Sequence, residues 1–350
     1  MQHSGFALCL LLALGTGASH AQTLNLLTWE AYFSDEAIAQ WEAQSGVHIN
    51  QIFFDKDEVR NTILFSSEST RIDLVVLDPT TASVIGERDF FVPLSQYRNT
   101  PNLVNADPVW AQRCGNFSVP YMWGSLGLVY RRDKVIPAPH SWNDLMHPKP
   151  AMQGHIGLVE NYVDTLAPAL ILRDAPVTTD DELILREVFE QMQTLIPWVL
   201  TFDYSISFLN NSPDADQLYL ALAYSGDQKQ LNALSGTDNW AYVIPDEGSM
   251  LWGECLAILA QSSNKSLAMD FINFMNIPEV AARNSEILGI TTANKAALPL
   301  LSEELRADPN LFPQGEYLHR LQHYDLNISI KNIMLRDRIT STLVELHDSQ

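Results

Sequence analysis

The chain has 350 residues, of which 42 are acidic and 21 are basic, so its formal net charge at neutral pH is -21. This acid excess excludes a nucleic-acid binder, which needs a basic stripe, and disfavours docking to an anionic membrane surface. The same charge raises the local concentration of cationic ligands, although many exported proteins are acidic for solubility alone.

The first 21 residues have the features of a cleavable secretory signal peptide. They contain no Lys, Arg, Asp or Glu, they include the apolar run GFALCLLLALGTG, and small residues Ser19 and Ala21 precede the expected cleavage point. No later stretch approaches the ~20 apolar residues that a membrane span needs. We therefore expect a periplasmic product without a membrane anchor. Its remaining 329 residues are enough for two domains.

Strands and helices alternate from residue 24 onward. Residues 24–28 predict a buried strand, 34–46 a helix capped by Ser34 and ended by Gly46, and 47–54 a second strand. A helix is expected in 57–68 and a strand in 71–78. This alternation is typical of βαβ units with a parallel sheet.

A clearer helix is predicted in 178–196, where Thr179 and Glu182 form a capping-box pattern. Its expected buried stripe consists of Ile184, Val188, Met192 and Leu195. Two further helices are predicted in 264–276 and 278–289. There is no linker-like segment, so two lobes would require the chain to cross between them more than once.

The sequence lacks the motifs of common enzymes. It has no P-loop, no GxGxxG after a strand and no GxSxG. His319 and His323 stand four apart but have no third metal ligand nearby in the sequence. We therefore expect no enzyme activity, no cofactor and no metal. Cys114 and Cys255 remain after signal cleavage, and an oxidising compartment permits a disulfide that the sequence alone does not establish.

Carboxylates and aromatic rings gather where strands are predicted to end. They are Trp29, Glu30, Tyr32, Asp78, Tyr224, Asp227, Trp252 and Glu254. Ligands of parallel α/β sheets bind at the carboxyl ends of strands. Acids among rings suit an alkyl-ammonium ligand, because rings hold the methylenes and the cation while acids neutralise the charge. The alternative is that these residues have no binding role: the aromatic rings would lie at the edge of the hydrophobic core, and the acids would be solvent-exposed.

The chain resembles the periplasmic spermidine/putrescine-binding proteins from about Leu24 to its C-terminus. The resemblance rests on several segments in order, among them TWEAYFSDEAIAQWEAQSGVHI, IDLVVLD, VPYMWGSLGLVYRRDKV, PHSWNDLMHP and IPDEGSMLWGECLAI. It implies an α/β periplasmic binding protein fold (type II) with mixed, mainly parallel sheets flanked by helices and a hinge of crossing strands. The expected lobes are 22–128 plus 253–305 and 129–252 plus 306–350, with the ligand in the cleft.

The resemblance also implies roles for single residues. Trp29, Tyr32 and Trp252 match aromatic positions of the polyamine groove, and Tyr224 replaces a groove Trp. The positions that would hold amines are Glu254, Asp164, Asn161 and Asp227.

Other positions depart from the family pattern. Thr80 and Ile290 stand where spermidine binders carry tyrosines. Glu30 and Asp78 are acids where small hydroxyl residues are usual. Because the site keeps carboxylates and aromatic rings suited to amines despite these changes, they indicate a polyamine site with altered selectivity and not a lost site.

The implied function is to bind a linear polyamine such as spermidine, putrescine or norspermidine and to close on it. The expected protein is a monomer and the substrate-binding component of a polyamine ABC transport system, with a permease as its membrane partner. A sensor-type branch of the family instead reports polyamines to an inner-membrane cyclic-di-GMP enzyme. The segment RCGNFSVPYMWGSLGLVYR resembles that branch more closely.

Overall fold

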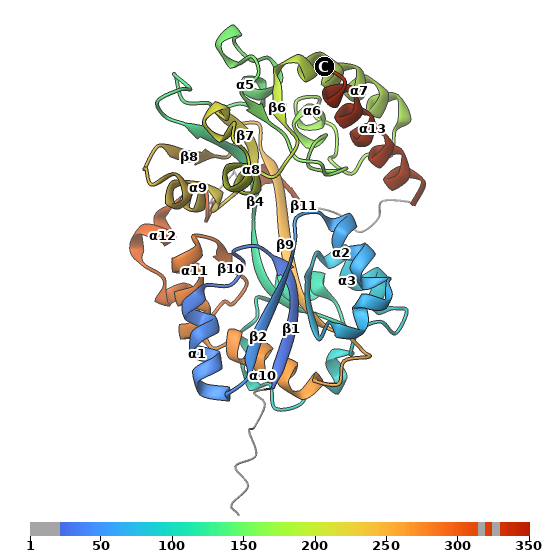
Figure 1. The fold of residues 1–350 in the computed structure, drawn as a ribbon, viewed down its shortest axis with the longest axis vertical. Coiled ribbons are helices and arrows are strands. Elements are labelled where there is room, and N and C mark those ends of the chain that lie inside the picture. The colour runs from blue at the N-terminus through green and yellow to red at the C-terminus, as the bar shows by residue number, and fades with distance from the viewer. Residues whose placement is uncertain (1–21, 314–318, 324–329) are drawn as a thin grey trace, which may run out of the picture.

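The computed structural model describes residues 22–313, 319–323 and 330–350 of the chain. The predicted signal peptide, residues 1–21, lies outside this part. Two α/β lobes are stacked along the long axis of the molecule, and two long strands run from one into the other (Figure 1). The two-lobed α/β architecture predicted from the sequence is confirmed.

Eleven strands are present in the described chain, in the order β1 (Thr23–Trp29), β2 (His48–Phe54), β3 (Leu74–Leu77), β4 (Val119–Arg131), β5 (Ile156–Gly157), β6 (Val199–Thr201), β7 (Leu220–Tyr224), β8 (Trp240–Val243), β9 (Ser249–Ile258), β10 (Thr291–Thr292) and β11 (Leu321–His323). The helices are α1 (Asp35–Ser45), α2 (Asp57–Leu64), α3 (Pro79–Gly86), α4 (Pro108–Cys114), α5 (Trp142–Met146), α6 (Ala167–Ile171), α7 (Glu182–Leu195), α8 (Ser205–Asn211), α9 (Asp227–Ser235), α10 (Lys265–Met275), α11 (Pro278–Leu288), α12 (Glu303–Ala307) and α13 (Ile330–Asp348). Short 3₁₀ segments join several of them.

The first lobe is built on β2, β1 and β3, with β9 beside β3. The pairs β1–β2 and β1–β3 are parallel, and β9 is antiparallel to β3. Alternate side chains point to opposite faces of a strand. Leu26 therefore packs in the core under α1, α10 and α11, whereas Leu27 packs in the core under α2 and α3. Burial on both faces explains why β1 reads as a continuous apolar run.

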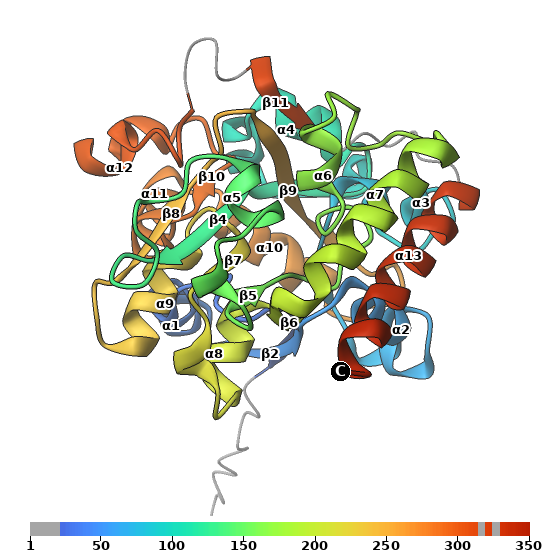
Figure 2. The ribbon, with the colours of Figure 1, turned by 90° about the horizontal axis from the view of Figure 1, so that it is seen from above.

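The second lobe is built on β4, β7, β5 and β6, with β8 also paired to β4. Strand β5 is parallel to β6 and β7, and β4 is antiparallel to β7 and β8. Leu222 packs toward α5, α6, α7 and α13, while Ala223 packs toward α8 and α9. Seen from above, α7 and α13 lie side by side on the outer surface of this lobe (Figure 2).

Strands β4 and β9 connect the lobes. Residues 119–125 of β4 pair with residues 251–256 of β9, and residues 126–131 continue into the second lobe to pair with β7 and β8. Strand β9 pairs with β11 at its start and with β3 at its end. The crossing strands are therefore shared by both lobes. The exact lobe boundaries given above remain a prediction.

Helix ends follow the predicted capping chemistry at one helix and depart from it at another. Ser34 caps α1 by accepting the N–H of Ala37, and Gly46 ends it with a left-handed φ of 69°. The capping box predicted for Thr179 and Glu182 is wrong. Asp181 is the N-cap of α7, because its carboxylate accepts the backbone N–H groups of Leu183 and Ile184.

The predicted buried stripe of α7 is shifted at its first position. The fully buried residues of this helix are Leu185, Val188, Met192 and Leu195. Ile184 is only partly buried. The helix begins two residues later than the expected cap. Leu185 and Ile184 lie three and four residues before Val188, so both are on the side of the core, and Leu185 is the one that is fully buried.

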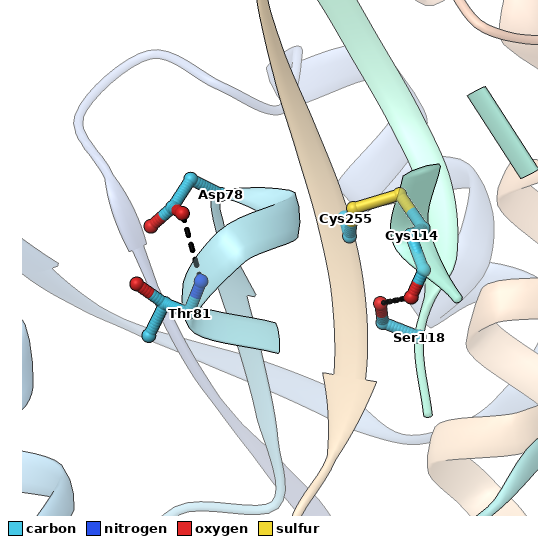
Figure 3. Close-up of a disulfide and its surroundings, with 5 residues drawn as sticks. All are labelled: Asp78, Thr81, Cys114, Ser118 and Cys255. Atoms are coloured by element: carbon cyan, nitrogen blue, oxygen red, sulfur yellow. Dashed lines mark hydrogen bonds between the residues drawn. A yellow bond between two sulfur atoms is a disulfide. The ribbon is translucent and has the colours of Figure 1, made fainter. Parts of the chain in front are cut away.

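A disulfide joins Cys114, at the end of α4, to Cys255 in β9 (Figure 3). The Cα atoms are 5.9 Å apart and the bond closes a loop of 141 residues. Both cysteines are buried, and Ser118 donates a hydrogen bond to the carbonyl of Cys114 at 2.7 Å. The disulfide thus ties α4 to β9 at the residue that follows Glu254.

Replacing both cysteines by alanine should lower the free energy of unfolding by about 2–5 kcal/mol, because a long loop is no longer closed in the unfolded chain. Urea unfolding of the oxidised wild type and the double variant measures this difference. Equal midpoints and slopes in the two proteins would contradict it.

Candidate functional site

A cavity of about 180 Å³ lies between the two lobes. At 10–15 Å³ per water site, it has room for roughly ten or more water molecules, or for one small extended ligand. Its wall includes eight of the predicted site residues: Trp29, Tyr32, Asp78, Asn161, Asp164, Tyr224, Trp252 and Glu254. Glu30 and Asp227 are not part of the wall.

Strand ends deliver four of these side chains, whereas Trp252 and Glu254 lie inside β9, so the strand-end position predicted for these two is wrong. Trp29 is the last residue of β1, Tyr224 is the last residue of β7, and Asp78 directly follows β3. Ala31 adopts a left-handed φ of 58° in the turn after β1, and Tyr32 follows it into the cavity wall. A non-glycine residue in this conformation is uncommon and is typical of tight turns near functional sites.

Aromatic rings form a continuous row along the cavity. The ring centroids of Trp29 and Tyr32 are 6.3 Å apart, those of Tyr32 and Trp252 are 6.4 Å apart, and those of Trp252 and Tyr224 are 6.1 Å apart. Tyr204 extends the row, with its centroid 6.0 Å from that of Tyr224. The Trp252 indole is held by a 3.3 Å hydrogen bond to the carbonyl of Ser125. Such a row suits the methylenes of an extended chain.

Glu254 is a buried carboxylate with one oxygen left unpaired. Its Oε1 accepts the indole N–H of Trp29 at 3.1 Å, and its Oε2 is buried without a hydrogen-bond partner among the described residues. Burial raises the pKa of Glu254 well above its ordinary value, and the negative charge of Asp57 raises it further, while the cation of Arg60 opposes both. A buried unpaired polar atom is costly and rare, so a partner from outside the chain is expected here.

Asp164 is the second buried carboxylate of the wall. Its Oδ2 accepts the hydroxyl of Tyr224 at 2.5 Å. Burial raises the pKa of Asp164 to about 7, and the Tyr224 hydrogen bond limits this shift. Asn161 accepts the N–H groups of Val163 and Asp164 at 2.8 and 3.0 Å with its side-chain oxygen. That oxygen therefore holds the turn that carries Asp164, and a direct amine contact of Asn161 remains a prediction.

Asp227 lies behind the aromatic row. Its side chain accepts the Tyr204 hydroxyl at 2.6 Å and the backbone N–H of Tyr224 at 2.8 Å, and only 3% of the residue is exposed. Burial raises the pKa of Asp227 to about 7 against these two hydrogen bonds. The contacts support a positioning role for Asp227, which fixes Tyr204 and Tyr224.

The two unusual acids have different surroundings. Glu30 is exposed and lies outside the cavity wall. Asp78 lines the cavity, but both of its oxygens are engaged. Its Oδ1 accepts the N–H of Thr81 at 2.9 Å as the cap of α3 (Figure 3), and its Oδ2 accepts a 3.3 Å hydrogen bond from Arg60. Their roles as amine ligands remain predictions.

Several residues of the wall were missed in the sequence analysis. Arg60 is a buried cation of α2, Tyr204 follows β6, and Lys56 of the first lobe forms an ion pair with Glu160 of the second. Tyr204 in the run FDYS carries the same strand-end signal as the predicted aromatics. The other three could not be found from spacing, because their positions depend on how the lobes meet.

Histidine placement gives no metal cluster in the described part of the chain. His323 lies in β11 and its ring packs against Trp110 with centroids 5.8 Å apart. Burial lowers the pKa of His323, and Arg113 lowers it further. Among the described helices, none is long and apolar enough to cross a membrane.

Two α/β lobes around a cleft, joined by crossing strands, define a solute-binding protein. The family model of the bacterial extracellular solute-binding proteins matches residues 36–313. The chain therefore belongs to this family, as the resemblance predicted.

Three relatives show how far the similarity extends. The chain is 31% identical to the norspermidine sensor of Vibrio cholerae over 331 residues, which cover 94% of this chain and 91% of the sensor. It is 27% identical to the putrescine-binding periplasmic protein PotF of Escherichia coli, covering 88% of each. The solved structure of the spermidine/putrescine ABC transporter substrate-binding protein PotD of Streptococcus pneumoniae has a TM-score of 0.74 and 25% identity, and the match covers 93% of this chain and 100% of that chain. The predicted fold class is thereby confirmed.

Asp164→Asn should stabilise the empty protein at about pH 8 and change little near pH 4. The pKa of the folded state, about 7, exceeds the ordinary value of 3.8, so this group's favourable contribution is complete below 3.8 and is lost as the pH rises through 7. The gain at high pH is at most about 4 kcal/mol, equivalent to a three-unit pKa difference. Thermal unfolding at both pH values measures it.

The matched control is Asp238→Asn, which alters an exposed aspartate of the second lobe. It should leave the pH dependence of unfolding unchanged. Equal destabilisation by Asp164→Asn at both pH values would contradict the assigned ionisation of Asp164.

Proposed function

We propose that this protein binds a linear polyamine of the putrescine, spermidine or norspermidine class in the interlobe cleft, in the periplasm, and closes on it. The observation that carries the proposal is the buried Oε2 of Glu254, which has no partner in the described chain and belongs to a cavity walled by a row of aromatic rings. An ammonium group supplies both the charge and the N–H donors that this oxygen lacks.

The rest of the wall matches the chemistry of such a ligand. The row from Trp29 to Tyr204 covers the methylenes and offers cation–π contacts of about 0.5–2 kcal/mol each to the ammonium groups. Asp164 provides a second buried acid, and its hydrogen bond to Tyr224 couples the acid to the row. A chain that alternates cations with methylenes uses both kinds of surface at once.

The relatives support a polyamine as the ligand, and they are compatible with two roles for the protein, transport and sensing. Relatives are named as putrescine-binding and spermidine/putrescine-binding periplasmic proteins, and this favours delivery to the permease of an ABC transporter. The 31% identity to a norspermidine sensor over 94% of the chain favours the alternative, control of an inner-membrane cyclic-di-GMP enzyme. Polyamine uptake in a deletion strain separates them: reduced uptake supports transport, and unchanged uptake with altered biofilm formation supports sensing.

Calorimetry with a ligand panel tests the binding claim. Putrescine, spermidine and norspermidine should bind, whereas the neutral diol with the chain length of putrescine should not, because it cannot neutralise Glu254. An absence of binding heat and of thermal stabilisation with all three polyamines would overturn the proposal.

Glu254→Gln should weaken polyamine binding by about 2–5 kcal/mol, because the ammonium loses its buried counter-ion. The amide keeps the size of the side chain and an acceptor for Trp29. The matched control is Glu190→Gln, which removes an exposed carboxylate that pairs with Arg186 on α7. It should leave affinity unchanged. An affinity within about twofold of wild type, ~0.4 kcal/mol, would show that Glu254 does not bind an amine.

A further inference from the structure

The cavity wall contains a cation that belongs to the protein itself. Arg60 projects from α2, and its side chain is only 1% exposed. Its Nη1 donates to Asp57 Oδ1 at 2.7 Å, and its Nη2 donates to Asp78 Oδ2 at 3.3 Å. A guanidinium stays charged at any physiological pH, so this is a fixed positive charge between two carboxylates.

The two carboxylates that hold Arg60 are thereby occupied. Asp78 uses its other oxygen to cap α3 (Figure 3), and Arg60 also reaches the Thr81 hydroxyl at 3.4 Å. Asp57 and Asp78 both line the cavity. The wall also contains Asp55 and Glu58, which are exposed, and Glu160, which pairs with Lys56. Its other four acids fall into two sets: Glu254 and Asp164, which have no cationic partner among the described contacts, and Asp57 and Asp78, which share Arg60.

Arg60 acts electrostatically on Glu254, one of the two free acids. Its guanidinium carbon is 5.7 Å from the centroid of the Phe54 ring, and that ring is 4.5 Å from the ring of Trp29. Trp29 in turn donates to Glu254. The positive charge of Arg60 also acts on the pKa of Glu254, lowering it. A ligand ammonium on Glu254 would therefore also be repelled by the positive charge of Arg60.

Resting on the proposed polyamine function, we propose that Arg60 determines selectivity by holding the place between Asp57 and Asp78 that a further ligand ammonium would take. The site then favours polyamines with few ammonium groups. A tetraamine such as spermine brings four ammonium groups, two more than Glu254 and Asp164 can neutralise, and like charges in a partly buried site repel. A short diamine meets no such conflict.

Calorimetric titration of wild type and Arg60→Met with putrescine and spermine tests the proposal. The measured quantity is the ratio of the spermine affinity to the putrescine affinity. Removing the cation frees Asp57 and Asp78 for the additional ammonium, so the ratio should rise at least about tenfold, or 1.4 kcal/mol. Arg60→Gln, which keeps an N–H donor for Asp57, should raise the ratio too and serves if the Met variant does not fold.

Three controls isolate charge from packing. Arg60→Lys keeps the cation and should keep the wild-type ratio. The double variant Asp57→Asn/Arg60→Met removes one charge of each sign and should return the ratio toward that of wild type. Arg283→Met breaks an exposed ion pair with Glu36, neither of which is part of the cavity wall, and should leave the ratio unchanged.

The outcomes separate this inference from the proposed function. If wild type binds neither putrescine, spermidine, norspermidine nor spermine, the polyamine function itself fails. If wild type binds polyamines but the folded Met or Gln variant keeps the wild-type ratio, Arg60 is only a structural link between α2 and α3 and the selectivity inference is overturned.

Discussion

The antiparallel pairing of β4 with β9 holds the two lobes together. These strands carry both lobes, and β9 also supplies Trp252 and Glu254 to the cleft. The pairing needs glycine at two close approaches. A Cβ on Gly124 would lie 2.5 Å from the ring of Trp252, and a Cβ on Gly253 would lie 2.3 Å from the ring of Trp110. Small residues at these points let large rings pack on both faces of the hinge.

In the empty protein, the charged forms of two carboxylates in the cavity wall are energetically unfavourable. Glu254 and Asp164 are buried, and burial raises the pKa of each, so their charged forms are destabilised until a cation arrives. Asp57 and Asp78 instead have a counter-ion from within the chain, the guanidinium of Arg60. Only Glu254 and Asp164 are therefore left to be neutralised by the ammonium groups of a ligand. Natural binding sites commonly trade stability for function in this way.

The sequence was sufficient to predict the fold and most of the cavity wall because both rest on local patterns. Strand and helix alternation indicated the α/β class, and the strand-end rule pointed to Trp29 and Tyr224. Trp252 also lines the cavity, but from the interior of β9. Glu30 was included by the same rule, yet it is exposed, because successive residues at a strand end point to opposite sides. The sequence allowed the disulfide without establishing it, and the structure shows it.

The parts that could not be predicted depend on tertiary placement. Arg60 belongs to a helix whose pattern shows only that Asp57 is three residues away, and nothing local places Asp78 across from it. The Lys56–Glu160 pair joins side chains 104 residues apart. Asp227 looked like a cavity acid, but its two hydrogen-bond donors turn it into a support for Tyr204 and Tyr224.

The central claim is that ligand ammonium groups bind carboxylates that hold protons in the empty cleft. Calorimetry of polyamine binding in buffers of different ionisation enthalpy measures this directly. Near pH 6, below the pKa of about 7 for Asp164, polyamine binding should release protons. The affinity should also rise toward about pH 8, where the amines remain charged because alkyl ammonium groups have pKa values near 10. Polyamine binding without proton release, and with the same affinity at both pH values, would contradict it.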